Sequence, residues 1–325
     1  MLSRVADSIY WMSRYIERAE NVARFINVNL NLMLDLPAGS EEQWEPLVIT
    51  AGDQARFREL HGKATRENVI RFLAFDPENA NSILSCLRFA RENARSVREV
   101  ISSEMWEQLN KFYLMVNDAA DSFASMESPH DFFTDVKMAS HLFAGVTSAT
   151  MSHGEGWHFC RLGGLIERAD KTTRILDVKY FYLLPAVSYV GTPFDNIQWS
   201  AVLRSASALE MYRQRHGTIS PEKVAEFLIL DREFPRSVHF CLIKAEQSLH
   251  SITGTHLGTF RNAAEQRLGQ VCSELAYARI EDVISAGLHE FLDGLQTKLN
   301  HVGDAIFDSF FALRPMQRAA YRKGA

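Results

Sequence analysis

The chain has 325 residues, of which 46% are hydrophobic, so it can bury one large core or two smaller ones. Its formal net charge of −5 argues against a protein that coats nucleic acid through its overall field, although local basic patches stay possible. No apolar stretch is long enough to cross a membrane, and the N-terminal segment lacks the apolar region of a signal peptide. With four widely spaced cysteines that lack metal-ligand spacing, the sequence predicts a cytoplasmic protein.

Prolines and glycines are few, and runs rich in Val, Ile and Thr are scarce, so the composition favours an all-α fold. Helix starts are predicted where a capping side chain precedes a proline and an acidic residue, at Asp76-Pro77-Glu78, Ser128-Pro129 and Ser220-Pro221-Glu222. Gly217 predicts a helix end. We expect roughly five to seven helices in each half of the chain.

Residues 10–28 form the first strongly patterned helix, with an apolar face and an opposite charged face. The charged face carries Glu17, Arg18, Glu20 and Arg24, and Glu20 stands four residues before Arg24, which is the favourable order for an ion pair. Glu17 is also expected to lie between the like charges of Arg14 and Arg18. Three interpretations stay open for this face: a solvated surface, a semi-buried ion network, or a site for a ligand or partner.

A second patterned helix is predicted over residues 86–101, where four arginines fall on one stripe. They are Arg88, Arg91, Arg95 and Arg98. Guanidinium groups on one stripe can bind carboxylates or phosphates, including those of a nucleic acid. The favoured interpretation is that they pair with acids of neighbouring helices, conceivably Glu17 and Glu20.

The motif of the first helix returns 150 residues later, as Glu167, Arg168, Asp170 and Arg174. Further matches, such as Cys86-Leu87 with Cys241-Leu242, keep an offset of 155. We therefore predict a tandem duplication, with residues 1–150 and 151–315 packed as one helical bundle around a pseudo-twofold axis, and a basic tail over 316–325. Gly163 and Gly164 precede the second motif, and paired glycines inside a helix indicate close approach of another helix or a ligand.

The two motifs also contain carboxylates three residues apart, Glu17 with Glu20 and Glu167 with Asp170. Twofold-related carboxylates in a bundle could hold a metal, and oxygen ligands without histidine would favour Mg²⁺ or Mn²⁺. No nucleophile elbow, phosphate-binding loop or dinucleotide fingerprint is present, so the sequence supports no covalent catalysis and indicates no cofactor.

Four segments together resemble the alpha-E family of bacterial helical proteins, over essentially the whole chain. They are YWMSRYIERAENVARF, GGLIERADKTTRILDV, ARENARSVREVISSEMWEQLN and FPRSVHFC. The resemblance implies that Glu17-Arg18 and Glu167-Arg168 are copies of the family's Glu-Arg motif. It also implies a genomic association with a circularly permuted ATP-grasp ligase and a transglutaminase-like protein, in systems thought to make or modify peptides.

The leading hypothesis is therefore a helical accessory or scaffold protein that acts with such a ligase and performs no catalysis itself. A metal-dependent enzyme that uses the paired carboxylates is the alternative. Nucleic-acid binding through the arginine stripe is the least favoured, because the chain is acidic overall and glutamates share that stripe.

Overall fold

The structure is a computed structural model that describes residues 1–34, 44–123, 129–182 and 193–312. Every regular element in these ranges is helical, as predicted. The elements of the first 150 residues are α1 (Ser3–Leu34), α2 (Glu45–Ala51), α3 (Gln54–His61), α4 (Arg66–Ile70), the π-helical turn η1 (Arg71–Phe75), α5 (Ile83–Ser96), α6 (Ser103–Ser122) and α7 (Pro129–Thr150). The predicted basic tail, 316–325, lies outside the described residues.

The rest of the described chain forms eight further α-helices, one more than expected, and ends in a second π-helical turn, η4 (Phe307–Phe311). The eight are α8 (Glu155–Tyr182), α9 (Pro193–Ser205), α10 (Leu209–His216), α11 (Pro221–Leu230), α12 (Val238–Thr253), α13 (Ala263–Tyr277), α14 (Ile280–Ala286) and α15 (Leu288–Ile306). No helix in the described ranges has both the length and the apolarity that a membrane span requires.

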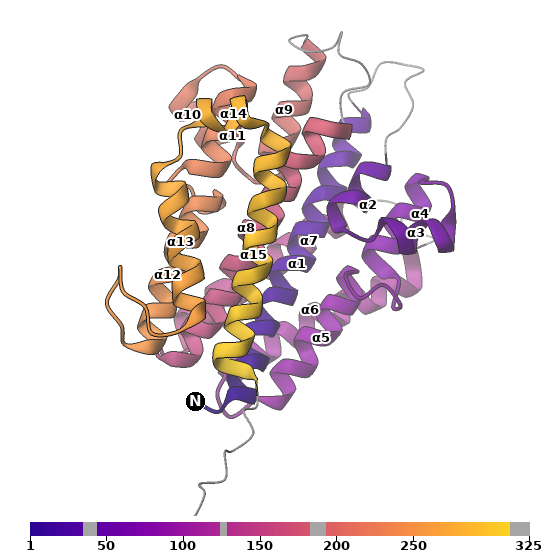
Figure 1. Ribbon diagram of the computed structural model, residues 1–325. Coiled ribbons are helices and arrows are strands. Elements are labelled where there is room, and N and C mark those ends of the chain that lie inside the picture. The colour runs from indigo at the N-terminus through magenta and orange to yellow at the C-terminus, as the bar shows by residue number, and fades with distance from the viewer. Residues whose placement is uncertain (35–43, 124–128, 183–192, 313–325) are drawn as a thin grey trace, which may run out of the picture.

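The two longest helices, α1 and α8, pack side by side at the centre of the molecule (Figure 1). Helices α5 and α7 pack against α1, and α6 covers both of them; α12 and α15 pack against α8, and α13 covers both of those. Because α1 is enclosed in this way, three of its charged side chains are buried as well as many apolar ones: Glu17, Glu20 and Arg24 are each at most 5% exposed, and Arg14 and Arg18 are partly buried. The interpretation of this face as a solvated surface was wrong.

Close approach of α1 and α8 depends on the predicted glycine pair. A Cβ atom on Gly163 would overlap the main-chain carbonyl of Tyr10, and one on Gly164 would lie 2.9 Å from Ser13 Oγ. Since only glycine lacks a Cβ atom, these two positions let the backbones of the central helices approach more closely than side chains would permit. The prediction of close helix approach at Gly163-Gly164 is confirmed.

Three helices of residues 54–96 begin 155 residues before three helices of residues 209–253. The first residues of α3 and α10, of α4 and α11, and of α5 and α12 all keep this spacing. Gly62 and Gly217 end the equivalent helices α3 and α10 with positive φ angles of 65° and 69°. Ser82 and Ser237 cap α5 and α12 through the same side-chain hydrogen bond, to the amide three residues later.

The helix boundaries agree with the sequence in some places and not in others. Gly217 follows α10, and Pro221 begins α11, as predicted. Pro129 begins α7 as predicted, while Ser128 lies outside the described residues. The start predicted at Asp76-Pro77-Glu78 was wrong, because Asp76 Oδ1 accepts the amide hydrogen of Glu78 and forms a local turn instead.

The helix predicted over residues 86–101 was too long. Helix α5 ends at Ser96, and residues 97–101 form turns before Ser102 caps α6. Arg98 therefore lies beyond the helix that carries Arg88, Arg91 and Arg95.

Replacing Gly163 by alanine should destabilise the protein by about 1–3 kcal/mol, because the new methyl group must push α1 and α8 apart. Chemical unfolding followed by circular dichroism measures the change. Gly145→Ala, in the exposed part of α7, is the matched control because its Cβ meets no atom within 4 Å. That substitution should be neutral or stabilising by up to about 1 kcal/mol. Equal effects of the two substitutions would contradict the close-packing explanation.

Candidate functional site

The two Glu-Arg motifs meet in the interface between α1 and α8, and each supplies the partner of the other. Arg168 of α8 forms a two-pronged ion pair with Glu17 of α1, with nitrogen–oxygen distances of 2.9 and 2.7 Å. Arg18 of α1 forms the reciprocal pair with Glu167 of α8, at 2.7 and 3.0 Å. Parallel two-pronged pairs of this kind are strong and directional. The sequence had left open whether the motifs meet, and the structure brings them together.

Glu167 is fully buried and accepts hydrogen bonds from two arginines of α1. Arg14 Nε donates to its Oε2 at 2.9 Å, and Lys171 Nζ lies 3.8 Å from Oε1. Arg18 also donates to Asn81 Oδ1 at 2.7 Å. The like charges of Arg14 and Arg18 are therefore bridged by Glu167 from the neighbouring helix, and the expectation that Glu17 would bridge them was wrong.

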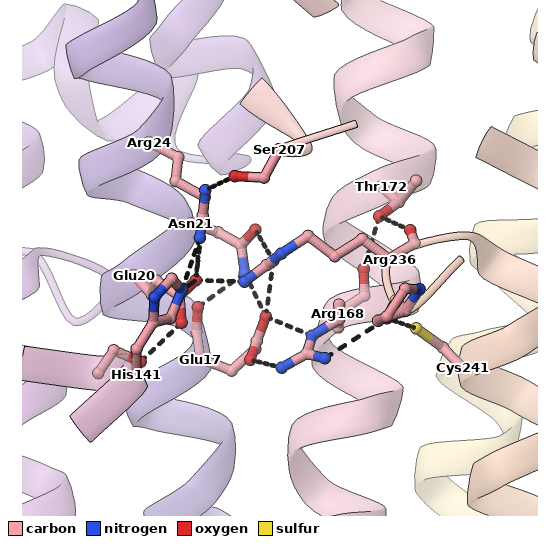
Figure 2. Close-up of polar contacts among 12 residues, drawn as sticks. Glu17, Glu20, Asn21, Arg24, His141, Arg168, Thr172, Ser207, Arg236 and Cys241 are labelled. Carbon is pink, nitrogen blue, oxygen red and sulfur yellow. Dashed lines mark hydrogen bonds and ion pairs between the residues drawn. The ribbon is translucent and has the colours of Figure 1, made fainter. Parts of the chain in front are cut away.

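Glu17 and Glu20 form the second half of the network (Figure 2). Arg236, just before α12, contacts both carboxylates and lies 3.1 Å from Glu17 Oε1. Ser140 of α7 donates to Glu20 Oε2 at 2.6 Å, and Arg24 Nη2 lies 2.7 Å from Glu20 Oε1. The predicted pairing of Glu20 with Arg24 is confirmed, and so is that of Asp170 with Arg174, at 2.9 Å.

Arg236 is a member of the network that the sequence did not place. In the sequence it was only part of the segment FPRSVHFC. Its distance from Glu17 along the chain, 219 residues, is beyond the reach of any periodicity argument. His141 of α7 was missed as well, and its Nε2 lies 3.3 Å from Glu20 Oε1.

The network keeps its carboxylates ionised although they are buried. Burial alone raises the pKa of Glu17 and of Glu20, but nearby guanidinium groups outweigh it and hold both pKa values below their ordinary level. Burial likewise opposes ionisation of Glu167, whose pKa Arg18, Arg14 and Lys171 nevertheless lower well below the usual range. A carboxylate with a lowered pKa is a poor proton donor and a weak base near neutral pH. The motif acids are thus suited to holding charge in place.

The arginine stripe does not reach this network. Arg95 pairs with Glu92 on its own helix at 3.0 Å, and Arg88 donates to the carbonyl of Pro77 at 3.2 Å. Arg91 donates to Asn110 of α6, and both Arg91 and Arg98 lie over the ring of Trp106. The favoured interpretation, that the stripe pairs with acids of neighbouring helices such as Glu17 and Glu20, was therefore wrong. Arg91 and Arg98 instead cover aromatic side chains of α6.

A cavity of about 290 Å³ lies beside the Glu17–Arg168 pair, between α1, α7, α8 and α12. Its lining is Ser13, Ile16, Glu17, Glu20, Ser140, His141, Phe143, Ala144, Thr147, Ser148, Trp157, Cys160, Arg161, Gly164, Leu165, Arg168 and Phe240. His141, Ala144 and Ser148 are exposed, so the α7 side forms the rim. Burial raises the pKa of the Cys160 thiol to about 11, which keeps it protonated near neutral pH.

The four carboxylates considered as metal ligands are Glu17, Glu20, Glu167 and Asp170. Each already contacts an arginine or lysine side chain. A cation would have to displace these groups before it could bind. Among the described residues, no group of three or more His, Cys, Asp or Glu side chains is placed to hold a metal ion.

Comparison with known proteins agrees with this picture of a helical module. Residues 1–311 match the model of a family described as a predicted alpha-helical domain with a conserved ER motif. An uncharacterized protein of Mycobacterium bovis and two from strains of Mycobacterium tuberculosis are each 24% identical over 336 aligned positions. The match covers 95% of this chain but only 37% of each relative's length. No solved structure matches significantly.

Removing one partner of the buried network should be costly. Glu167→Gln leaves Arg14 and Arg18 without their carboxylate and should destabilise the fold by about 3–5 kcal/mol. Glu274→Gln is the control, because it removes a glutamate from a surface pair with Lys298 and should cost less than about 1 kcal/mol. Urea unfolding of the unmodified protein and of both variants measures the two effects. Similar losses of stability would show that the buried pairs contribute no more than the surface pair.

Stability should fall in acid because the carboxylates of the network have lowered pKa values in the folded state. Their contribution is fully present above the pKa of an unfolded glutamate, about 4.3, and is lost as the pH falls towards the lower folded values. The free energy of unfolding, measured from pH 7 down to pH 3, should show this decline. Glu167→Gln should make the decline shallower than Glu274→Gln does, and parallel curves would count against the explanation.

Proposed function

The chain belongs to the Alpha-E family, and from this membership we propose that it is a helical accessory protein of a peptide-forming or peptide-modifying system. In this proposal it docks a circularly permuted ATP-grasp ligase, works beside a transglutaminase-like protein, and holds or presents their peptide substrate. The ligase performs the chemistry, and this chain performs none. A cytoplasmic location is part of the proposal, since such a ligase uses ATP and the four cysteines of this chain are unpaired.

The observation that carries the proposal is that both Glu-Arg motifs form ion pairs with each other inside the bundle. Their charged groups neutralise one another across α1 and α8, and the acids have lowered pKa values. Groups held in this way build a rigid pair of helices and are poorly suited to transfer protons or attack a substrate. This favours a binding or scaffolding role over catalysis.

The length of the relatives supports the same conclusion. This chain corresponds to 37% of each mycobacterial protein that it matches, so in those proteins the module is part of a longer polypeptide. A domain that occurs joined to further chain is suited to working in contact with other domains. The ligase and the transglutaminase-like protein are the partners that the family resemblance suggests.

We further propose that the module arose by tandem duplication of residues 1–150 and 151–315 around a pseudo-twofold axis. The constant spacing of 155 residues between α3–α5 and α10–α12 supports it. The reciprocal exchange between the Glu-Arg motifs supports it as well. A twofold axis would map the Glu17–Arg168 pair onto the Glu167–Arg18 pair. The axis would pass between α1 and α8.

The α7 face is our candidate for ligase contact. Met138 and Leu142 lie one helical turn apart, are 59% and 55% exposed, and neighbour His141 at the cavity rim. Exposed apolar side chains beside a pocket are typical of interaction surfaces. A partner bound there could reach a substrate held in the cavity.

The test is co-expression with a circularly permuted ATP-grasp ligase from the same organism, followed by purification through a tag on one partner. We expect a complex, faster ligase turnover when this chain is present, and binding weakened about tenfold or more by Met138→Asp with Leu142→Asp. Leu257→Asp, at an exposed leucine in the segment between α12 and α13, is the matched control and should bind as the wild type does. Absence of a complex together with unchanged turnover would refute the proposal.

A further inference from the structure

The cavity between α1, α7, α8 and α12 contains one cation that the ion network does not use. Arg161 of α8 lines the cavity and is partly buried. Among the described residues it has no carboxylate within ion-pair distance. Its guanidinium group lies over the ring of Trp157, 5.1 Å from the ring centre. Burial, and then the charge of Arg161, lower the pKa of the nearby His158. Trp157 is in turn stacked on His153, at 4.1 Å. An arginine supported by a tryptophan ring keeps its hydrogen-bond donors available for an anion.

Arg161 and Arg168 stand on the same face of α8, seven residues apart, and both line the cavity. Two helical turns separate them, which is about 10 Å along the helix axis. Arg168 is neutralised by Glu17, so it adds hydrogen-bond donors without adding net charge. Arg161 contributes the uncompensated positive charge. The cavity is therefore arranged to receive an anion at the end nearest Trp157.

The opposite part of the lining contains two carboxylates that are already paired with arginines. Glu17 and Glu20 both border the cavity, and their positive partners Arg24, Arg168 and Arg236 belong to the network already described. A single negative charge on the ligand would balance Arg161, whereas a second one would meet no unpaired arginine in the lining. A monoanion such as a carboxylate fits this balance better than a phosphate dianion.

Much of the remaining lining is apolar or aromatic, and Ser13, Thr147 and Ser148 add hydroxyl groups. Trp157, Phe143, Phe240 and Leu165 border the same space. A volume of about 290 Å³ is at the lower limit of small-ligand pockets, so it suits one amino-acid residue with an apolar side chain rather than a long segment. Apolar walls with one charged anchor usually fix such a ligand by its polar end.

We infer that this cavity binds the free α-carboxylate of a peptide whose last residue is apolar or aromatic, with Arg161 as the anchor and Trp157, Phe143 and Phe240 around the side chain. This inference rests on the proposed function, because it takes a peptide as the source of the carboxylate. It adds which end of the peptide is held, and where. A terminal residue held at the α7 rim would be next to the face proposed for the ligase.

The test uses the isolated chain and needs no ligase, so its failure is distinguishable from a failure to bind the ligase. Isothermal titration compares N-acetyl-L-phenylalanine, its uncharged amide and phenyl phosphate. We expect saturable binding of the carboxylate, binding of the amide weaker by about tenfold or more, and no tighter binding of phenyl phosphate. This comparison on the unmodified protein holds whether or not any variant folds.

Substitution then locates the anchor. Arg161→Gln should weaken binding of N-acetyl-L-phenylalanine about tenfold or more, because it removes the charged hydrogen bonds to the carboxylate. Arg95→Gln, at an exposed arginine of α5, is the matched control and should leave binding unchanged. Equal binding of acid and amide, tighter binding of phenyl phosphate, no saturable binding, or full binding by a folded Arg161→Gln variant would each overturn the inference.

Discussion

The exchange of Glu17–Arg168 and Arg18–Glu167 across α1 and α8 is the interaction on which the rest of the bundle depends. Buried ion pairs are expensive, because both ions lose their water and the Coulomb attraction only offsets that loss when the geometry is good. What such pairs contribute is a single defined register between the two helices. A slip of one helical turn, about 5.4 Å, would break both pairs at once, whereas apolar side chains would tolerate several registers. Gly163 and Gly164 bring the backbones close enough for this register to be held.

Two buried ion pairs on neighbouring helices need further partners, and these come from the surrounding elements. The segment before α12 supplies Arg236, which contacts Glu17, and the segment before α5 supplies Asn81, which accepts a hydrogen bond from Arg18. Helix α7 supplies Ser140 and His141, which contact Glu20 of the same network. The network therefore fixes the outer helices against the inner pair. It also explains why arginine predominates: its planar group can serve two acceptors at once, as Arg236 does for Glu17 and Glu20.

Local features of the fold could be predicted from the sequence, and long-range ones could not. The all-α class, the glycine contact and the i,i+4 pairs follow from propensity and helical spacing, which act over a few residues. The same spacing cannot tell a charged face that meets solvent from one that meets another helix, so Glu17 and Glu20 could equally have been exposed. Arg14 shows this limit of helical spacing. Its position beside Arg18 predicted a bridging acid, and in the structure that acid is Glu167, 153 residues away along the chain.

The prediction made for the arginine stripe was wrong for a related reason. A helical wheel assumes a continuous helix, and α5 ends at Ser96, so Arg98 leaves the face that the wheel assigned to it. Aromatic side chains of α6 then offered an alternative to carboxylate partners, since a guanidinium group also packs well on an aromatic ring. The charge pattern of the sequence favoured carboxylates as partners of these arginines. In the folded protein, Arg91 and Arg98 pack on aromatic rings of α6 instead.

The chemistry open to the molecule follows from how its charges are held. Acids whose pKa values are lowered are weak bases near neutral pH, and a Cys160 thiol whose pKa is raised to about 11 is a weak nucleophile there. What the same lining retains is shape, aromatic surface and the charge of Arg161. Such a site can hold a molecule in one orientation while another protein reacts with it, because orientation requires fixed charges and walls, and bond making requires groups that change their protonation. In the proposed function, the rigidity supplied by the Glu-Arg exchange is itself functional, since an anchor on α8 would be useful to a partner on α7 only if the two helices keep a constant separation.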